Sequence, residues 1–201
     1  EDKIRFDTGG TERVVIDSNG ITMSSGLING VGINAIESES ILISNDGGTG
    51  TISSALRNTG FGYEVFDDLT SGDDNTAVGR RALTKVTTGS GNTAMGSGTI
   101  ELTTTGSNNT GFGFGALYAN TTADDNTAVG YAALSVNSTG AANVAIGALA
   151  LDANTTADNN VAVGYLSLTN NTTGALNVGV GKDSLKNNTT GANNTGLGKS
   201  A

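Results

Sequence analysis

Large apolar residues recur along residues 58–201 with a period of 17, which is the mark of a repeat protein. Each unit begins with Asn, taken here as position 0, and carries Gly at position 4 in all nine units. A large apolar residue stands at position 3 in every unit and at position 8 in every complete unit. The asparagines are Asn58, Asn75, Asn92, Asn109, Asn126, Asn143, Asn160, Asn177 and Asn194. Position 3 holds Phe61, Val78, Met95, Phe112, Val129, Ile146, Val163, Val180 and Leu197, and position 8 holds Phe66, Leu83, Ile100, Leu117, Leu134, Leu151, Leu168 and Leu185.

The polar and apolar positions of one unit predict a strand, a bend, a second extended stretch and a turn. Thr and Val before position 3 favour a pleated surface, Gly allows a positive φ or a close backbone approach, and Asn-Thr-Thr-Gly is typical of a turn. The helix-like stretch in each unit is too short for more than one turn of helix. The pattern therefore predicts an all-β fold, a β-solenoid or β-roll rod whose eight complete coils extend roughly 40 Å at ~4.8 Å per coil.

The first 57 residues do not follow this period and predict different elements. Residues 1–23 alternate short apolar runs with turn clusters, which predicts a small β meander. Residues 24–57 are rich in Gly and Ser and predict a β-rich connector leading into residues 58–201, the eight complete repeats and a truncated ninth. The start at Glu1 without Met and the stop inside a ninth unit at Ala201 indicate a fragment or processed chain, so further coils or another domain are expected.

Each coil holds little apolar material for a chain that must fold alone. Two large apolar side chains contribute on the order of 1.5–3 kcal/mol apiece when buried. Ordering one residue costs ~1.5 kcal/mol. We therefore expect several copies to pack together, with the apolar column at position 3 or at position 8 facing a shared axis.

Composition and charge narrow the function classes. The chain has no Cys, His, Pro or Trp, so zinc and thiol chemistry are excluded and the usual general base near neutral pH is missing. A formal net charge of -9 with ten scattered Lys and Arg disfavours nucleic acid as a partner. No apolar run approaches the ~20 residues that span a bilayer, so no membrane insertion is expected. We expect a non-enzymatic protein with no catalytic residues, no cofactor and no metal.

Several residue columns nevertheless suggest chemistry and have a structural alternative. The Asn column could present a ligand surface, but stacked amides that hydrogen-bond along the rod explain it better. The pairs Asp67-Asp68, Asp73-Asp74 and Asp124-Asp125 could bind calcium, but none lies in a calcium loop, and solvated turn charges are the preferred interpretation. The adjacent Thr residues in each unit suggest ice binding, but neighbours in an extended segment point to opposite faces, so only one of the two columns can face outward.

Two further candidates concern sugars. A tailspike-type glycosidase needs two carboxylates roughly 5–9.5 Å apart, and Glu64 and Glu101 lie two coils apart at different unit positions, so no pair stands out. Tyr131 and Tyr165 share position 5 and are candidate surface contacts for a glycan. Arg80 and Lys182 occupy the same column, which indicates a solvent-facing position.

The repeat and the first segment carry a resemblance. The string Asn-Thr-Ala-Val-Gly-Tyr at 126–131, followed by Ala-Leu and then Asn-Ser-Thr-Gly up to residue 140, resembles the head repeats of trimeric autotransporter adhesins and, more closely, the same repeat in bacteriophage tail fibres. Residues 3–20 resemble a segment of tail fibre and tail-associated proteins of marine phages. The 17-residue unit is longer than the adhesin unit, and no membrane anchor is recognisable, which favours the phage interpretation.

The resemblance implies a homotrimer, a left-handed β-roll and a role in attachment to a cell surface, with no catalytic residues to transfer. It predicts a structural, adhesin-like spacer rod of a phage tail fibre, a virion component that contributes to host attachment. Other tail or fibre proteins and a host-cell receptor would then be partners, and the virion tail its location. The alternative is the head of a bacterial trimeric surface adhesin, or another extracellular filament, on the bacterial cell surface.

Overall fold

The computed structural model describes residues 55–201 throughout and, before them, the backbone of six strands. These six are β1 (Ile4–Thr8), β2 (Thr11–Asp17), β3 (Gly20–Met23), β4 (Leu27–Ile28), β5 (Val31–Ile36) and β6 (Ser40–Ser44). One strand per repeat unit follows: β7 (Thr59–Phe61), β8 (Thr76–Val78), β9 (Thr93–Met95), β10 (Thr110–Phe112), β11 (Thr127–Val129), β12 (Val144–Ile146), β13 (Val161–Val163), β14 (Val178–Val180) and β15 (Thr195–Leu197). All elements in this described part of the chain are β-strands.

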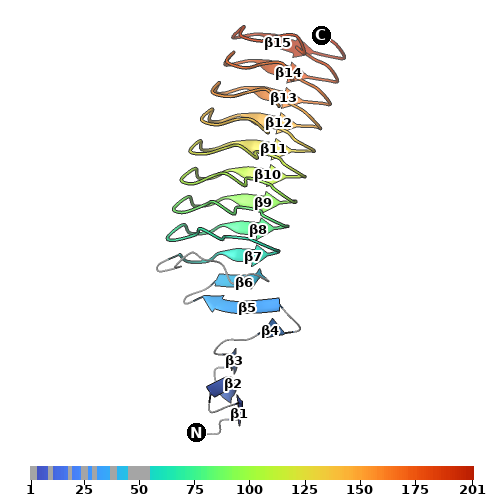
Figure 1. Ribbon diagram of the computed structural model, residues 1–201. Helices are drawn as coiled ribbons and strands as arrows, with labels where there is room; N and C mark the ends of the chain where they lie inside the picture. Colours follow the sequence, from blue (N-terminus) through green and yellow to red (C-terminus); the bar gives the residue numbers. More distant parts are fainter. Residues whose placement is uncertain are drawn as a thin grey trace.

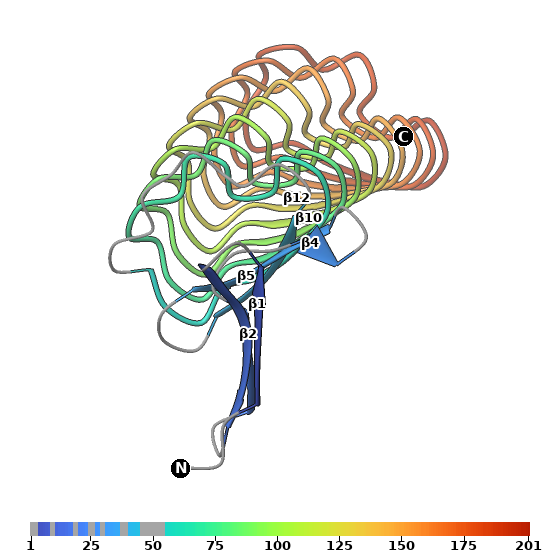
Figure 2. The same ribbon diagram turned by 60° about the horizontal axis from the view of Figure 1, so that its bottom comes forward.

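The repeat units form a parallel β-solenoid, which confirms the predicted fold class. Strands β7 to β15 pair in parallel with each neighbour shifted by 17 residues, as in Thr127↔Val144 and Val129↔Ile146 between β11 and β12. Figure 1 shows the coils stacked in chain order from β7 to β15. Seen nearer to its end in Figure 2, the stack repeats one outline along the rod. Each coil therefore presents the same unit position on the same side.

Six strands precede the coils, and they belong to two different sheets. Strands β1, β2 and β3 form a three-stranded antiparallel sheet in that order, within the segment for which the sequence predicts a meander. Strands β4, β5 and β6 are also antiparallel to one another, but β6 pairs in parallel with β7. The connector strands thus continue the sheet of the rod, and the first coil stacks on β6.

A narrow apolar core runs along the inside of the coils. The side chains at position 8 are buried, with relative exposures of 0–1% from Phe66 through Leu168, and small residues such as Ala128 and Ala133 fill positions 2 and 7 beside them. Leu185, near the last coil, is only partly buried against this cluster. The column at position 8 is therefore the interior of a single chain.

The prediction of a second extended stretch in each unit is wrong. After position 4 the chain makes successive turns, and positions 6 and 8 adopt the left-handed region, as in Ala132 (φ 50) and Leu134 (φ 53). The N–H of Ala132 donates to Phe114 O of the preceding coil at 2.9 Å, whereas the N–H of Leu134 donates to Ala150 O of the following coil at 3.0 Å. A left-handed residue costs roughly 1–2 kcal/mol. Hydrogen bonds to both neighbouring coils and the burial of Leu134 offset that cost.

The Gly at position 4 is required by close stacking, as the sequence suggests. Gly79 has a φ of +133, and a Cβ there would lie 2.5 Å from Gly96 O of the next coil. The same contact recurs up the column, with 2.6 Å between a Cβ on Gly113 and Gly130 O. Only a residue without a side chain lets adjacent coils approach this closely at such a φ.

Candidate functional site

The outward face of the parallel sheet carries a continuous apolar stripe, defined here as the outer apolar stripe and formed by the nine position-3 side chains. In each three-residue strand the middle residue points inward, so positions 1 and 3 point outward. Phe61 is 57% exposed, Phe112 44% and Ile146 40%. Of the two columns predicted to face a shared axis, position 8 lies within one chain, and position 3 alone is available to another molecule.

The Asn column at position 0 is an internal amide ladder, which confirms the structural interpretation. These side chains are buried from Asn58 through Asn177. The N–H of Asn143 donates to Asn126 Oδ1 at 3.0 Å, and Asn126 Nδ2 donates to Gly140 O at 2.9 Å. Asn126 thus satisfies the backbone of its own coil and of the next one. Asn160 keeps only the second bond, accepting the N–H of Asn177 at 2.9 Å, while its buried Nδ2 has no hydrogen-bond partner. The column is buried and offers no ligand surface.

A second amide ladder lies at position 11, where the sequence indicates only turn chemistry. Asn137 Nδ2 donates to Asn120 Oδ1 at 3.1 Å, and Asn154 Nδ2 donates to Asn137 Oδ1 at 2.8 Å. The first two coils hold Leu69 and Val86 at this position, both buried. The recurrence of Asn at position 11 from residue 120 onward is the signal that could have identified the ladder.

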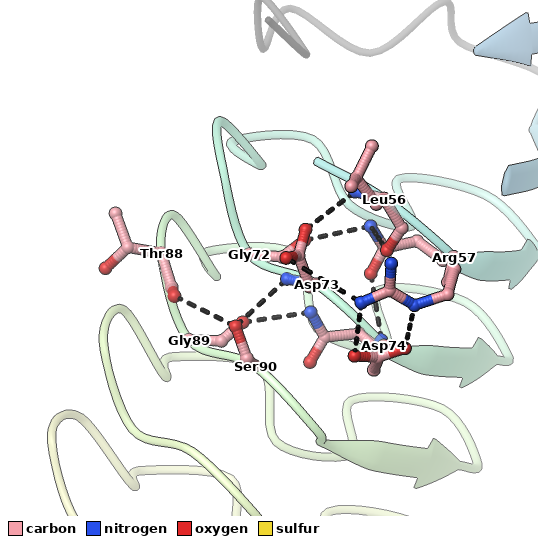
Figure 3. Close-up of polar contacts among 10 residues, drawn as sticks. Leu56, Arg57, Gly72, Asp73, Asp74, Thr88, Gly89 and Ser90 are labelled. Atoms are coloured by element: carbon pink, nitrogen blue, oxygen red, sulfur yellow. Dashed lines mark hydrogen bonds and ion pairs between the residues drawn. The ribbon is translucent and has the colours of Figure 1, made fainter. Parts of the chain in front are cut away.

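Two residues of the acidic pairs, Asp73 and Asp124, lie at position 15 and form hydrogen bonds between coils. Asp73 Oδ1 accepts the N–H of Leu56 at 2.7 Å, and the N–H of Asp73 donates to Ser90 Oγ at 3.0 Å (Figure 3). Three coils further on, Asp124 Oδ1 accepts the N–H of Ser107 at 2.7 Å. These carboxylates bond the backbone of the preceding coil, a more specific role than solvated turn charges. Within residues 55–201, no three acidic side chains gather where they could hold a metal ion.

Asp74, the neighbour of Asp73, makes a bidentate ion pair with Arg57. Arg57 Nε donates to Asp74 Oδ1 at 2.6 Å and Arg57 Nη2 donates to Asp74 Oδ2 at 2.9 Å (Figure 3). The hydrogen bond from Arg57 holds the pKa of the Asp74 carboxyl below its ordinary value of 3.8. Asp74 has a φ of 58, a conformation that Asp tolerates better than most residues.

The two glutamates meet at one arginine. Arg81 Nε lies 2.9 Å from Glu64 Oε2, and Arg81 Nη2 lies 2.9 Å from Glu101 Oε1. Glu101 is only 4% exposed. The sequence separates these carboxylates by two coils, and the structure links them through the coil between. Both carboxylates therefore form ion pairs with the Arg81 guanidinium, and this pair of ion pairs joins three successive coils.

Tyr131 and Tyr165 are exposed but are not brought together. Tyr131 is 57% exposed and stacks on Phe114, with ring centroids 5.8 Å apart and planes 12° apart. Tyr165 is 47% exposed, and Lys182 Nζ lies 5.8 Å from its ring centroid. Ala148 occupies the same column between them. The sequence interpretation missed Phe114, although its place at position 5 was visible.

In the coil that begins at Asn177, ion pairs shift the pKa values of Lys182 and Asp183. Lys182 Nζ lies 2.9 Å from Asp183 Oδ2, and Lys186 Nζ lies 3.2 Å from Asp183 Oδ1. Hydrogen bonds from Lys182 and then Lys186 hold the pKa of Asp183 below 3.8. The hydrogen bond to Asp183 raises the pKa of Lys182 above 10.5.

The two adjacent hydroxyl columns differ as predicted, because only one faces outward. At position 12, Thr121 Oγ1 donates to Ser138 O of the next coil at 3.0 Å. At position 13, Thr122 and Thr139 are exposed. The half-buried column thus stabilises the turn through bonds between coils.

Comparison of the chain with protein-family models, with curated proteins and with solved structures finds no match. Among the residues that the structure describes, none belongs to a helix of the length and apolar character needed to cross a bilayer.

Proposed function

We propose that this chain is a structural rod of an attachment fibre, in which parallel copies associate through the outer apolar stripe. The single observation that carries the proposal is that stripe. It is apolar in all nine coils, faces outward, and is 36–78% exposed at Phe61, Met95, Phe112, Val129, Ile146 and Leu197. A contiguous exposed apolar surface of this kind marks an interaction site.

The repetition of the stripe from coil to coil supplies the free energy that association requires. Full burial of a Val or Ile side chain contributes about 1.5–3 kcal/mol, so covering a half-exposed one contributes roughly 1 kcal/mol. Association costs an estimated ~4–15 kcal/mol in lost translational and rotational freedom. One coil cannot offset that cost, whereas nine stripe side chains together contribute about 9 kcal/mol, which is comparable with it. A uniform column along a stack of identical coils therefore suits parallel copies of the same chain in axial register.

The biological assignment follows the resemblance of residues 3–20 and of the repeat. We infer a homotrimeric spacer segment of a phage tail fibre that contributes to host-cell attachment. It would lie in the virion tail beside other fibre or tail proteins. The alternative is the head of a bacterial trimeric surface adhesin or another extracellular filament. Immunogold electron microscopy with antibodies to the purified chain separates the two, since label on virion tails supports the first and label on uninfected cells supports the second.

Association itself is tested with matched double variants and sedimentation equilibrium. Replacing Val129 and Ile146 with Asp introduces charge into the stripe of two adjacent coils, and we expect the trimer to dissociate to monomer. The control replaces Thr122 and Thr139 with Asp at the exposed position 13 of nearby turns, and the trimer should persist. A wild-type chain that sediments as a folded monomer would contradict the proposal.

A further inference from the structure

A groove of about 300 Å³ runs along the rod across four coils, beginning at Arg80 and ending at Val136. Its lining comes from positions 5, 6, 9 and 10 of successive units and includes no residue of the outer apolar stripe at position 3. Position 6 contributes Gly98, Gly115 and Ala132. A volume of this size is at the lower end of the roughly 300–1,000 Å³ found for ligand pockets.

The groove exists because position 6 is small in three consecutive coils. Other coils carry Arg81 before this stretch and Leu149 and Leu166 after it in the same column. Gly98 and Gly115 have φ values of +66 and +64, and a Cβ on Gly115 would meet nothing within 4 Å. The backbone path is the same as at Leu149 (φ 55), so the space is left by missing side chains and not by a different fold.

Aromatic rings and polar groups line this space together. Phe114 is 62% exposed and Tyr118 is 40% exposed, both from one coil, and Tyr131 extends the aromatic surface by stacking on Phe114. A Cβ on Gly98 would lie 3.3 Å from Glu101 Oε2, so that oxygen borders the groove while Glu101 Oε1 lies 2.9 Å from Arg81 Nη2. Ser97 and Ser135 also line the groove, so their hydroxyls and the phenol of Tyr118 add polar groups to it.

The charges of the groove balance. Glu101 is ion-paired with Arg81, which also pairs with Glu64, and Arg80 adds one guanidinium at the rim. The surroundings favour neither a strongly cationic nor a strongly anionic ligand. Exposed aromatic faces beside hydrogen-bonding groups suit a molecule with an apolar face and a rim of hydroxyls. We propose that the groove binds a neutral oligosaccharide lying along the rod axis.

A second copy of the chain fits this groove poorly. Position 3 is apolar in every coil, as association between identical aligned chains requires, whereas position 5 varies from Arg80 through Ser97 and Phe114 to Ala148 and Lys182. The groove is therefore a local feature of a few coils. The inference rests on the attachment role proposed above and supplies its ligand class, but the groove lies within one chain, so association can hold where sugar binding fails.

The test titrates the full chain with four neutral probes, maltohexaose, cellohexaose, chitohexaose and mannohexaose, by isothermal calorimetry and saturation-transfer NMR. The key variant is Gly115→Leu, which places in the groove the residue that the same column already carries at Leu149 and Leu166. We expect at least one probe to bind and Gly115→Leu to weaken that binding tenfold or more, with Phe114→Ala weakening it as well. The control Tyr165→Ala removes an exposed aromatic of the same column outside the groove and should leave binding unchanged.

Circular dichroism and sedimentation of each variant show whether fold and association are intact. Binding of none of the four probes overturns the inference while leaving the proposed rod unaffected if the chain is still trimeric. Binding that Gly115→Leu does not change overturns it as well, because the sugar then lies elsewhere. Preferential binding of choline or of a heparin hexasaccharide would show a charged-ligand site, and dissociation of the trimer by Gly115→Leu would show an interface between copies; either result replaces the oligosaccharide.

Discussion

The columns at position 8 and position 3 are alike in sequence and opposite in environment. Both are apolar in every unit that contains them, and both recur every 17 residues. Leu134 at position 8 is 0% exposed, whereas Val129 at position 3 of the same coil is 37% exposed. The difference teaches that hydrophobic periodicity locates apolar columns but does not say which one forms the core of a single chain.

The largest expected effect tests that contrast directly. Leu134→Ala removes buried side-chain atoms from a narrow core, and we expect a loss of about 2–5 kcal/mol in the free energy of unfolding. Val129→Ala in the same coil should change it by less than ~1 kcal/mol at protein concentrations too low for association. Urea unfolding followed by far-UV circular dichroism measures both. Equal losses would show that position 3 is also part of the core of one chain.

A second pair of variants compares a glycine packed against the next coil with a glycine beside open space. A Cβ on Gly130 (φ +136) would lie 2.6 Å from Gly147 C, so we expect Gly130→Ala to destabilise the rod by about 2–3 kcal/mol through strain and overpacking. Gly115→Ala adds the same atom in open space at φ +64, so we expect only the backbone cost of a left-handed residue, roughly 1–2 kcal/mol. Thermal unfolding of the two variants should separate them, and similar melting temperatures would contradict close stacking at position 4.

The amide ladder at position 11 gives a smaller effect. Asn137→Leu supplies the residue that the first coil carries at Leu69, but it removes the Oδ1 that accepts from Asn154 Nδ2. One buried N–H of Asn154 then lacks its acceptor and Asn120 Oδ1 lacks its donor, and we expect a loss of about 1–2 kcal/mol. Asn170→Leu, at an exposed position of a later coil, is the control with little expected change. A stabilised Asn137→Leu variant would show that the ladder is dispensable and that an apolar column serves equally well.

The smallest expected effect concerns the exposed ion pair between Arg57 and Asp74. Because Arg57 lowers the pKa of Asp74, the pair stabilises the fold above the ordinary pKa of 3.8, and this contribution is lost as pH falls through the lower folded value. We expect Arg57→Ala to raise the pKa of Asp74 toward 3.8, measured by carboxyl ¹³C NMR titration. The pKa of Asp183, lowered by Lys182 and Lys186, should not change. An unchanged titration of Asp74 would show that the ion pair does not form in solution.

Some of the candidate site was within reach of the sequence and some was not. Tyr131 and Tyr165 were correctly placed on the surface, because their column also holds charged residues such as Lys182. The bridge from Glu64 to Glu101 through Arg81 was not foreseen, because it joins positions 6 and 9 of different coils. Such a contact depends on the rotation of one coil relative to the next, which residue spacing does not specify.

The sequence alone determined the 17-residue period, the all-β stacking of coils, the Gly column and the Asn column, because each of these follows from a residue type repeated at a fixed interval. Tertiary structure decided which apolar column is buried and where the groove lies. The alternation rule of a strand assigns faces only over positions 1 to 3, and beyond Gly the chain turns through left-handed residues. That turn, held by hydrogen bonds to the coils on either side, directs Leu134 inward, while Val129 stays exposed on the outer face of the sheet.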